Sequence, residues 1–186
     1  MNYGGPLLGI FACKGDRLLR HMPGRIIGST TTQDGEQVAY CMALQTREQH
    51  IRRGKATSNI CTNEALLALA ASIYLSLLGP SGITELAATI AERTSYAIEQ
   101  LGKLRAVRVP GFDAFHYMEF TMNFDRAGKK VSEINEALLK AGIQGGMDLN
   151  KHFPELGEAA LYCFTEVHTH RDIDMLTDKL RVILEA

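Results

Sequence analysis

The sequence has no excess of charge of either sign. Twenty Lys and Arg residues stand against twenty-one Asp and Glu residues, which gives a formal net charge of −1. A protein that binds nucleic acid through its overall positive charge is therefore not expected, and any basic function must be local. Hydrophobic residues make up 46% and charged residues 22% of the 186 positions, which excludes a disordered or fibrous chain and fits about one ordinary domain.

Cysteine is scarce, and its spacing shows no pattern. The four cysteines are far apart and none belongs to a Cys-x-x-Cys pair: Cys13, Cys41, Cys61 and Cys163. This spacing indicates neither a zinc site nor a redox dithiol, and it fits a reducing, cytoplasmic compartment. Cys61 lies at the start of an expected helix, where a thiolate would be stabilised, but an inert thiol is the simpler interpretation.

Export signals, membrane spans and common catalytic motifs are also missing. The N-terminus lacks the charged region and the apolar core of a signal peptide. The longest uncharged stretch, residues 65–84, is interrupted by Gly and Pro at 79–82, so we expect a buried helix and not a membrane span. No G-x-G-x-x-G, P-loop, G-x-S-x-G or H-E-x-x-H motif occurs, so nucleotide-binding, esterase and zinc-protease functions lose their usual support.

The first 44 residues predict a strand, a short helix and a hairpin. Residues 7–13 form a continuous apolar run between turn residues, which is typical of a buried strand. Residues 14–22 resemble a short amphipathic helix. Residues 25–32 and 37–44 flank an Asp-Gly turn, which predicts a β-hairpin.

Helices and strands alternate in the remainder. An apolar run from Thr62 to Gly79 predicts a helix buried on most faces, and a second, half-exposed helix follows at 83–101. Aromatic and β-branched residues predict strands at 107–109, 115–124 and 160–166. Amphipathic helices are predicted at 132–141, with Gly142 as C-cap, and at 172–185, with Thr169 as N-cap. This order indicates an α/β fold with helices on one sheet face and a soft boundary near residue 60.

One short segment concentrates positive charge. Between residues 47 and 55 there are four basic residues and one acid, a local charge of +3. Arg47, Arg52 and Arg53 suit bidentate recognition of carboxylate or phosphate, and His50 lies among them. A solvated helix face is the alternative interpretation. Hydrogen-bonding side chains around the segment favour a site lining: Gln45, Thr46, Gln49, Ser58, Asn59 and Thr62.

Two further patterns have the residue types of a binding site. Gly4 and Gly5 could let the backbone approach a phosphate, although an ordinary tight turn explains them as well. His168 and His170, with Glu166, could ligate a metal, but a spaced third partner is missing and histidine near a helix cap has structural uses. No metal is therefore predicted.

The basic segment carries a resemblance. The strings QTREQHIRR at 45–53 and KATSNICT at 55–62 closely resemble the signature of the glycine decarboxylase P-protein of the glycine cleavage system. The flanks agree, since the Gly-Gly-Pro turn at 4–6 and Met-Pro-Gly-Arg at 22–25 also look like that family. The resemblance is strong over roughly the first 80 residues and rests on overall layout beyond them.

The resemblance implies a fold, a cofactor and a place in the enzyme. The family uses pyridoxal phosphate on a type I aminotransferase-like fold and is split into two subunits in many bacteria and archaea. This chain resembles the C-terminal part of subunit 1, the half without the Schiff-base lysine, which subunit 2 carries. Residues 1–60 would then be a tail of the large domain, and residues 61–186 the linking helices and a small α/β domain. A further N-terminal portion is also implied.

The implied function is that of glycine dehydrogenase (decarboxylating), an oxidoreductase. The family decarboxylates glycine and passes the aminomethyl group to the lipoyl arm of the H-protein, so subunit 2, the H-protein and glycine are the implied partners. The fragment alone would be inactive. The resemblance marks seven residues as lining the site or the subunit interface, without individual roles: Arg47, His50, Arg52, Arg53, Thr57, Ser58 and Asn59.

Two functions compete with this one. A non-catalytic scaffold would only stabilise the lysine-bearing subunit. An RNA-binding module would use the basic segment, but it lacks an aromatic platform and the net charge is near zero.

Overall fold

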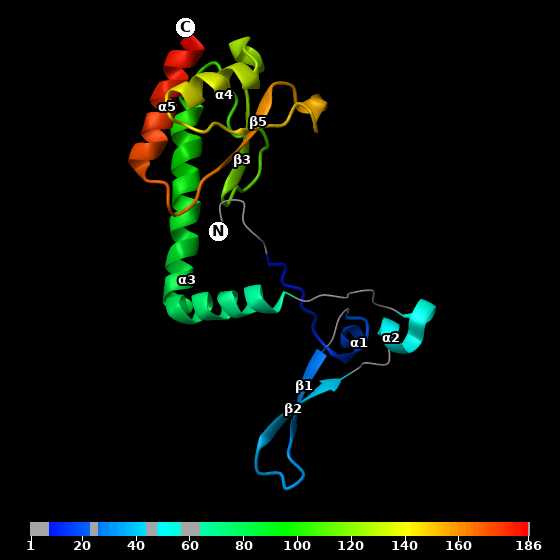
Figure 1. Cartoon of the computed structure of the whole chain (residues 1–186). Helices are drawn as coiled ribbons and strands as arrows, with labels where there is room; N and C mark the ends of the chain where they lie inside the picture. Colours follow the sequence, from blue (N-terminus) through cyan, green and yellow to red (C-terminus); the bar gives the residue numbers. More distant parts are fainter. Residues whose placement is uncertain (1–7, 23–25, 44–47, 57–63, 186) are drawn as a thin grey trace. The chain divides into compact units, whose positions relative to one another are not determined.

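The computed structural model describes residues 8–22, 26–43, 48–56 and 64–185. The chain forms two compact units, Met1–Leu77 and Leu78–Ala186, and Figure 1 labels their elements. The boundary expected near residue 60 lies outside the described residues. The predicted α/β class is confirmed, because helices combine with a two-stranded and a three-stranded sheet.

The first unit contains the predicted hairpin. Strands β1 (Ile26–Thr31) and β2 (Val38–Ala43) pair antiparallel. Gly35 takes a φ of 76° in the connecting loop, a conformation that suits glycine. The Asp34 carboxylate accepts hydrogen bonds from the Thr32 hydroxyl and from a backbone amide, and these bonds lower its pKa.

The strand predicted at residues 7–13 is wrong. Residues 8–13 form no strand, and the Ile10 side chain is 83% exposed. An apolar run becomes a buried strand only beside a partner strand, and no described segment pairs with this one. The helix expected at 14–22 is shorter than predicted and comprises α1 (Asp16–Leu19).

The helix α3 (Ala65–Gly102) contains the two helices that the sequence predicts. Gly79 interrupts it with a φ of 61° and a ψ of −178°, and Pro80 follows. The expectation that residues 65–78 are buried on most faces is wrong for this chain, since Leu66 and Leu77 are 79% and 81% exposed. An all-round apolar helix needs neighbours on most sides, and the described residues do not supply them.

In the part of the chain that the structure describes, α3 alone has the length and apolar composition of a membrane span. The interruption at Gly79 limits its first apolar stretch to residues 65–78. A membrane helix needs about 20 apolar residues, so this stretch is too short.

The second unit is built on a three-stranded antiparallel sheet in the order β3-β5-β4. These strands are β3 (Glu119–Asn123), β4 (Met147–Asp148) and β5 (Ala159–Cys163). The predicted strands at 115–124 and 160–166 are confirmed in shortened form. The strand expected at 107–109 is reduced to an isolated bridge from Arg108 to Asn123.

Helices cover one face of this sheet. Phe120 pairs with Tyr162 and Met122 with Ala160 across β3 and β5, and all four are buried. They pack with residues of α3, of α4 (Val131–Lys140) and of α5 (His170–Glu185), including Leu101, Ile134, Leu138, Ile173 and Leu180. The helices predicted at 132–141 and 172–185 are thereby confirmed. Short 3-10 turns η3 (Asp125–Ala127) and η4 (Pro154–Leu156) complete this unit.

The predicted cap of the last helix is also confirmed. The Thr169 hydroxyl accepts a hydrogen bond from the Asp172 amide at 3.2 Å. In return, the Asp172 carboxylate accepts a bond from the Thr169 amide at 2.8 Å. This reciprocal arrangement satisfies two backbone donors at the start of α5.

Candidate functional site

The described part of the basic segment is a single helical turn followed by a 3-10 turn. Helix α2 (Gln49–Arg52) begins after Glu48, whose carbonyl accepts a hydrogen bond from the Arg52 amide at 2.9 Å. The 3-10 turn η2 (Arg53–Lys55) follows directly. Glu48 is buried, and its carboxylate lies 3.5 Å from the ring nitrogen Nδ1 of the exposed His50. This contact ties His50 to the start of the helix.

Arg53 has an unusual backbone. Its φ of 51° is the one positive value among the non-glycine residues that the structure describes. With a ψ of −125°, the residue lies near the first central position of a type II′ turn, which glycine normally occupies. Such a conformation costs on the order of 1–3 kcal/mol, and strained residues of this kind concentrate at functional sites.

The cationic side chains of this segment face outward. Arg52, Arg53 and Lys55 are all exposed. Within residues 8–22, 26–43, 48–56 and 64–185, no carboxylate lies within ion-pair distance of any of the three. Three cations on about one turn can therefore bind an external carboxylate, a phosphate or an acidic protein surface.

The rest of the predicted lining lies outside the described residues. This applies to Arg47, Thr57, Ser58 and Asn59, and to the phosphate-approach turn at Gly4 and Gly5. Of the seven predicted lining residues, the structure places His50, Arg52 and Arg53 next to one another.

The two histidines of the possible metal site, His168 and His170, contact different groups. Nδ1 of His168 accepts a hydrogen bond from the Thr165 amide at 3.0 Å. Nε2 of His170 lies 2.6 Å from a carboxylate oxygen of Glu92, and its ring packs against Tyr96. Among the described residues, no three His, Cys, Asp or Glu side chains converge in a way that could hold a metal ion.

The environment of each lysine matters, because pyridoxal phosphate is held covalently by a lysine as a Schiff base. All eight lysines of the sequence lie in the described ranges, and seven are exposed. The eighth, Lys129, is half-buried and donates a hydrogen bond to the Ile183 carbonyl at 2.5 Å. A Schiff-base lysine needs burial or a cationic neighbour to lose its proton. Lys55, which follows Arg52 and Arg53 closely in the sequence, lies in an exposed turn.

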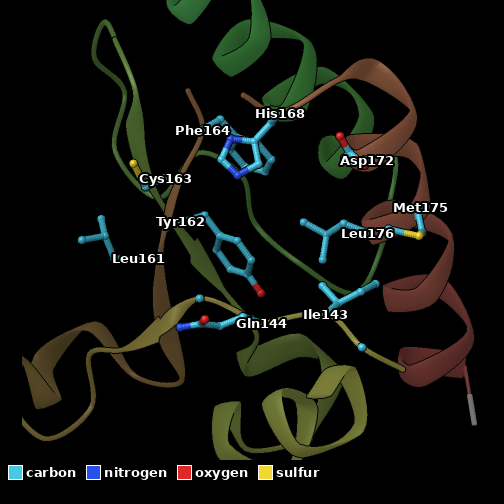
Figure 2. A pocket seen from close by; sticks show the side chains of 13 residues that line it. Ile143, Gln144, Leu161, Tyr162, Cys163, Phe164, His168, Asp172, Met175 and Leu176 are labelled. Carbon is cyan, nitrogen blue, oxygen red and sulfur yellow. The ribbon is translucent and has the colours of Figure 1, made fainter. Parts of the chain in front are cut away.

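A cavity of about 450 Å³ opens in the second unit. Its walls are β5, the glycine-rich loop after α4 and the first turns of α5 (Figure 2). Tyr162, His168 and Asp172 contribute polar groups, and Ile143 and Leu176 contribute apolar surface. The sequence pattern does not predict this cavity. The sequence does contain one sign of it. Tyr162 shares a strand face with Ala160 and Phe164, so its hydroxyl is expected to point inward, where a tyrosine hydroxyl needs a hydrogen-bond partner.

Comparison with known proteins gives a consistent result over the whole chain. A family model described as "Glycine cleavage system P-protein" matches residues 1–180. The similarity therefore extends well beyond the first 80 residues, in which the resemblance of sequence motifs is strong.

Individual relatives agree. A protein of Staphylothermus marinus named "Probable glycine dehydrogenase (decarboxylating) subunit 1" is 55% identical over 99% of this chain. A protein of the same name from Pyrococcus horikoshii is 49% identical over 99% of it. The chain spans 39% and 40% of the length of these two relatives.

A solved structure supports the fold. It is described as a crystal structure of glycine decarboxylase (P-protein) of the glycine cleavage system, in inhibitor-bound form. The match has a TM-score of 0.85 and 32% identity, and it covers 98% of this chain and 40% of the solved chain. The type I aminotransferase-like class expected from the resemblance is confirmed by this match.

Proposed function

The chain belongs to the family of the glycine cleavage system P-protein, and on that premise we propose that it is the C-terminal part of subunit 1 of a glycine decarboxylase. The observation that carries the proposal is the 55% identity to a relative of that name over 99% of the chain. The assembled enzyme would decarboxylate glycine with pyridoxal phosphate and transfer the aminomethyl group to the lipoyl arm of the H-protein. It would act in the cytoplasm.

The cofactor would be held covalently by the partner, subunit 2. Seven lysines of this chain are exposed, and Lys129 donates a hydrogen bond to a backbone carbonyl. Both observations support a Schiff-base lysine on subunit 2. Pyridoxal phosphate, when bound, would supply the electron sink for the carbanion that decarboxylation leaves.

The basic segment would bind an anionic group at the assembled site or at the subunit interface. Arg52, Arg53 and Lys55 are available for this role because no described carboxylate pairs with them. A guanidinium binds a carboxylate or a phosphate through two parallel hydrogen bonds, which fixes orientation as well as charge. Glu48 would hold His50 beside them through the contact between their side chains.

Reconstitution tests the proposal. The full-length subunit 1 that carries this chain is mixed with subunit 2, H-protein and glycine, and release of carbon dioxide is measured beside a pull-down of the complex. We expect activity only when both subunits are present. Failure of the assembled pair to decarboxylate glycine would contradict the proposed activity.

The same assay separates a site lining from a scaffold. Arg52→Ala is compared with Arg105→Ala, which removes an exposed arginine of the second unit. Loss of activity with assembly intact would place Arg52 at the site, whereas loss of both would place it at the interface. Full activity in both variants would favour the scaffold, which contributes no chemistry.

A further inference from the structure

The hydroxyl of Tyr162 is buried without a hydrogen-bond partner among the described residues. The residue is 5% exposed, and no described group accepts a hydrogen bond from its hydroxyl. Tyrosine hydroxyls are normally paired when buried, because an unpaired polar group in the interior destabilises the fold. Figure 2 shows the hydroxyl directed toward the part of the cavity beside Ile143.

The hydroxyl remains neutral and can donate. Burial raises the pKa of Tyr162 to about 12, and the Gly146 amide beside the hydroxyl oxygen only partly opposes this rise. That amide can only donate, so the hydroxyl proton has no acceptor among the described residues. A neutral phenol in this position calls for an acceptor oxygen or nitrogen, such as the carbonyl of an amide.

The polar groups at the other side of the cavity are held in place by their own chain. The Thr165 amide can only donate, so Nδ1 of His168 accepts, and the proton of the neutral ring lies on Nε2. The His168 ring also packs edge-on against Phe164, with ring centroids 5.5 Å apart. Asp172 is fixed by the Thr169 amide and hydroxyl, which leaves its second oxygen without a hydrogen bond among the described residues.

The charge of the lining selects against anions. The cavity is lined by one carboxylate, Asp172, and by no lysine or arginine. Hydrogen bonds from Thr169 lower the pKa of Asp172, so the carboxylate is ionised at neutral pH. The remaining surface is largely apolar, from Ile143, Phe164 and Leu176 together with Leu161 and Met175.

We propose that this cavity is a binding site for a small neutral or cationic organic molecule with an apolar body and one hydrogen-bond acceptor. The acceptor pairs with the Tyr162 hydroxyl, and the apolar body lies against Ile143, Met175 and Leu176. A donor on the ligand, where present, reaches the free oxygen of Asp172. The cavity lies wholly within the second unit, so the proposal does not rest on the proposed enzymatic activity.

The test compares two probes of nearly equal shape and different charge. Valeramide carries an apolar tail, an acceptor and a donor, whereas sodium valerate replaces the amide by a carboxylate. Binding of each probe to the complete polypeptide that carries this chain is measured by ligand-observed NMR titration. We expect valeramide to bind and valerate to bind at least tenfold more weakly.

Two variants and a control locate the site. Tyr162→Phe removes only the hydroxyl and is expected to weaken valeramide binding between about three- and tenfold, the loss of one hydrogen bond. Met175→Trp fills the cavity from a half-exposed helix position and is expected to abolish binding. Tyr117→Phe removes a hydroxyl from an exposed tyrosine of the same unit and is expected to change nothing.

Three results would overturn the inference. The first is no valeramide binding to the parent protein at tens of millimolar. The second is binding that survives both Tyr162→Phe and Met175→Trp unchanged. The third is binding of valerate as tight as that of valeramide, since an anion should be repelled by Asp172. Circular dichroism of each variant verifies that its fold is retained.

Discussion

A Cβ atom built on Gly146 would lie 2.6 Å from the ring of Tyr162. Carbon atoms do not approach so closely, so position 146 requires glycine for space and not for backbone conformation. The same residue is tied to α4, since the Asn135 amide donates a hydrogen bond to the Gly146 carbonyl at 2.8 Å. The loop that forms one wall of the cavity is therefore packed from two sides.

Gly146→Ala should destabilise the second unit by about 1–3 kcal/mol, because the aromatic ring must move out of its packed position. The midpoint of thermal unfolding measures this. Gly102→Ala is the matched control, since its added Cβ would meet its nearest neighbour at 4.0 Å. Equal unfolding temperatures in the two variants would contradict the packing argument.

Tyr162→Phe should raise the free energy of unfolding by about 1 kcal/mol in the absence of ligand. The variant removes a buried hydroxyl that no described group satisfies and keeps the ring that packs on Phe120. Denaturant titration of parent and variant provides the comparison, with Tyr117→Phe as reference. A loss of stability would show that the hydroxyl is satisfied in the folded protein.

Arg53→Gly should stabilise the first unit by about 1 kcal/mol, because glycine adopts the observed positive φ without strain. Arg52→Gly should do the opposite by a similar amount, since Arg52 has helical values of φ −92° and ψ −4°. Proteolytic susceptibility of the segment and thermal unfolding would distinguish the two variants. If Arg53 is functional, its glycine variant will be more stable and less active.

Acid should destabilise the start of α5 through Asp172. The hydrogen bonds from Thr169 lower the folded-state pKa of Asp172 below its ordinary value of 3.8. A lowered folded pKa means that this stabilisation is present above pH 3.8 and is lost as the pH falls through the folded pKa. The free energy of unfolding, measured between pH 6 and pH 2, should therefore fall less steeply with decreasing pH in Asp172→Asn than in the parent protein. Thr169→Val, which removes the side-chain donor, should show part of the same effect.

Arg52→Lys and Arg53→Lys should reduce decarboxylation by the reconstituted enzyme nearly as much as the alanine variants do. Lysine keeps the charge but lacks the bidentate geometry, and loss of one buried charge-assisted contact costs on the order of 2–5 kcal/mol. The solvated-face alternative predicts changes within about 0.5 kcal/mol for every variant. Steady-state rates at saturating glycine decide between them.

Local pattern determined most elements of the second unit. The aromatic and β-branched run around Phe120 predicted a strand, and the apolar spacing around Leu138 predicted a helix, and both are present. The cap at Thr169 and the stop at Gly79 also followed from residue type. These features depend on backbone preference and on periodicity, which neighbours in sequence define.

Other features depended on contacts that sequence order does not specify. The apolar run at 7–13 and the apolar helix at 65–78 both predict burial, yet most of their described residues are exposed and none is buried, because burial requires a partner surface as well as apolar side chains. The sequence also placed cationic residues at 47–55 but did not show that Arg53 has a positive φ. That value depends on how the turn closes.

The sequence by itself determined the family of this protein, because the string at 45–62 is long, ordered and specific. In the second unit it also determined the helices α4 and α5 and the strands β3 and β5, but it did not predict the two-residue strand β4. Tertiary structure alone decided the cavity. Tyr162 and His168 lie on β5 and in the loop after it, while Gly146 and Leu176 come from segments on either side in the chain. They line one space only because β4 and β5 pair and α5 packs back on the sheet, and such long-range packing is absent from local sequence pattern.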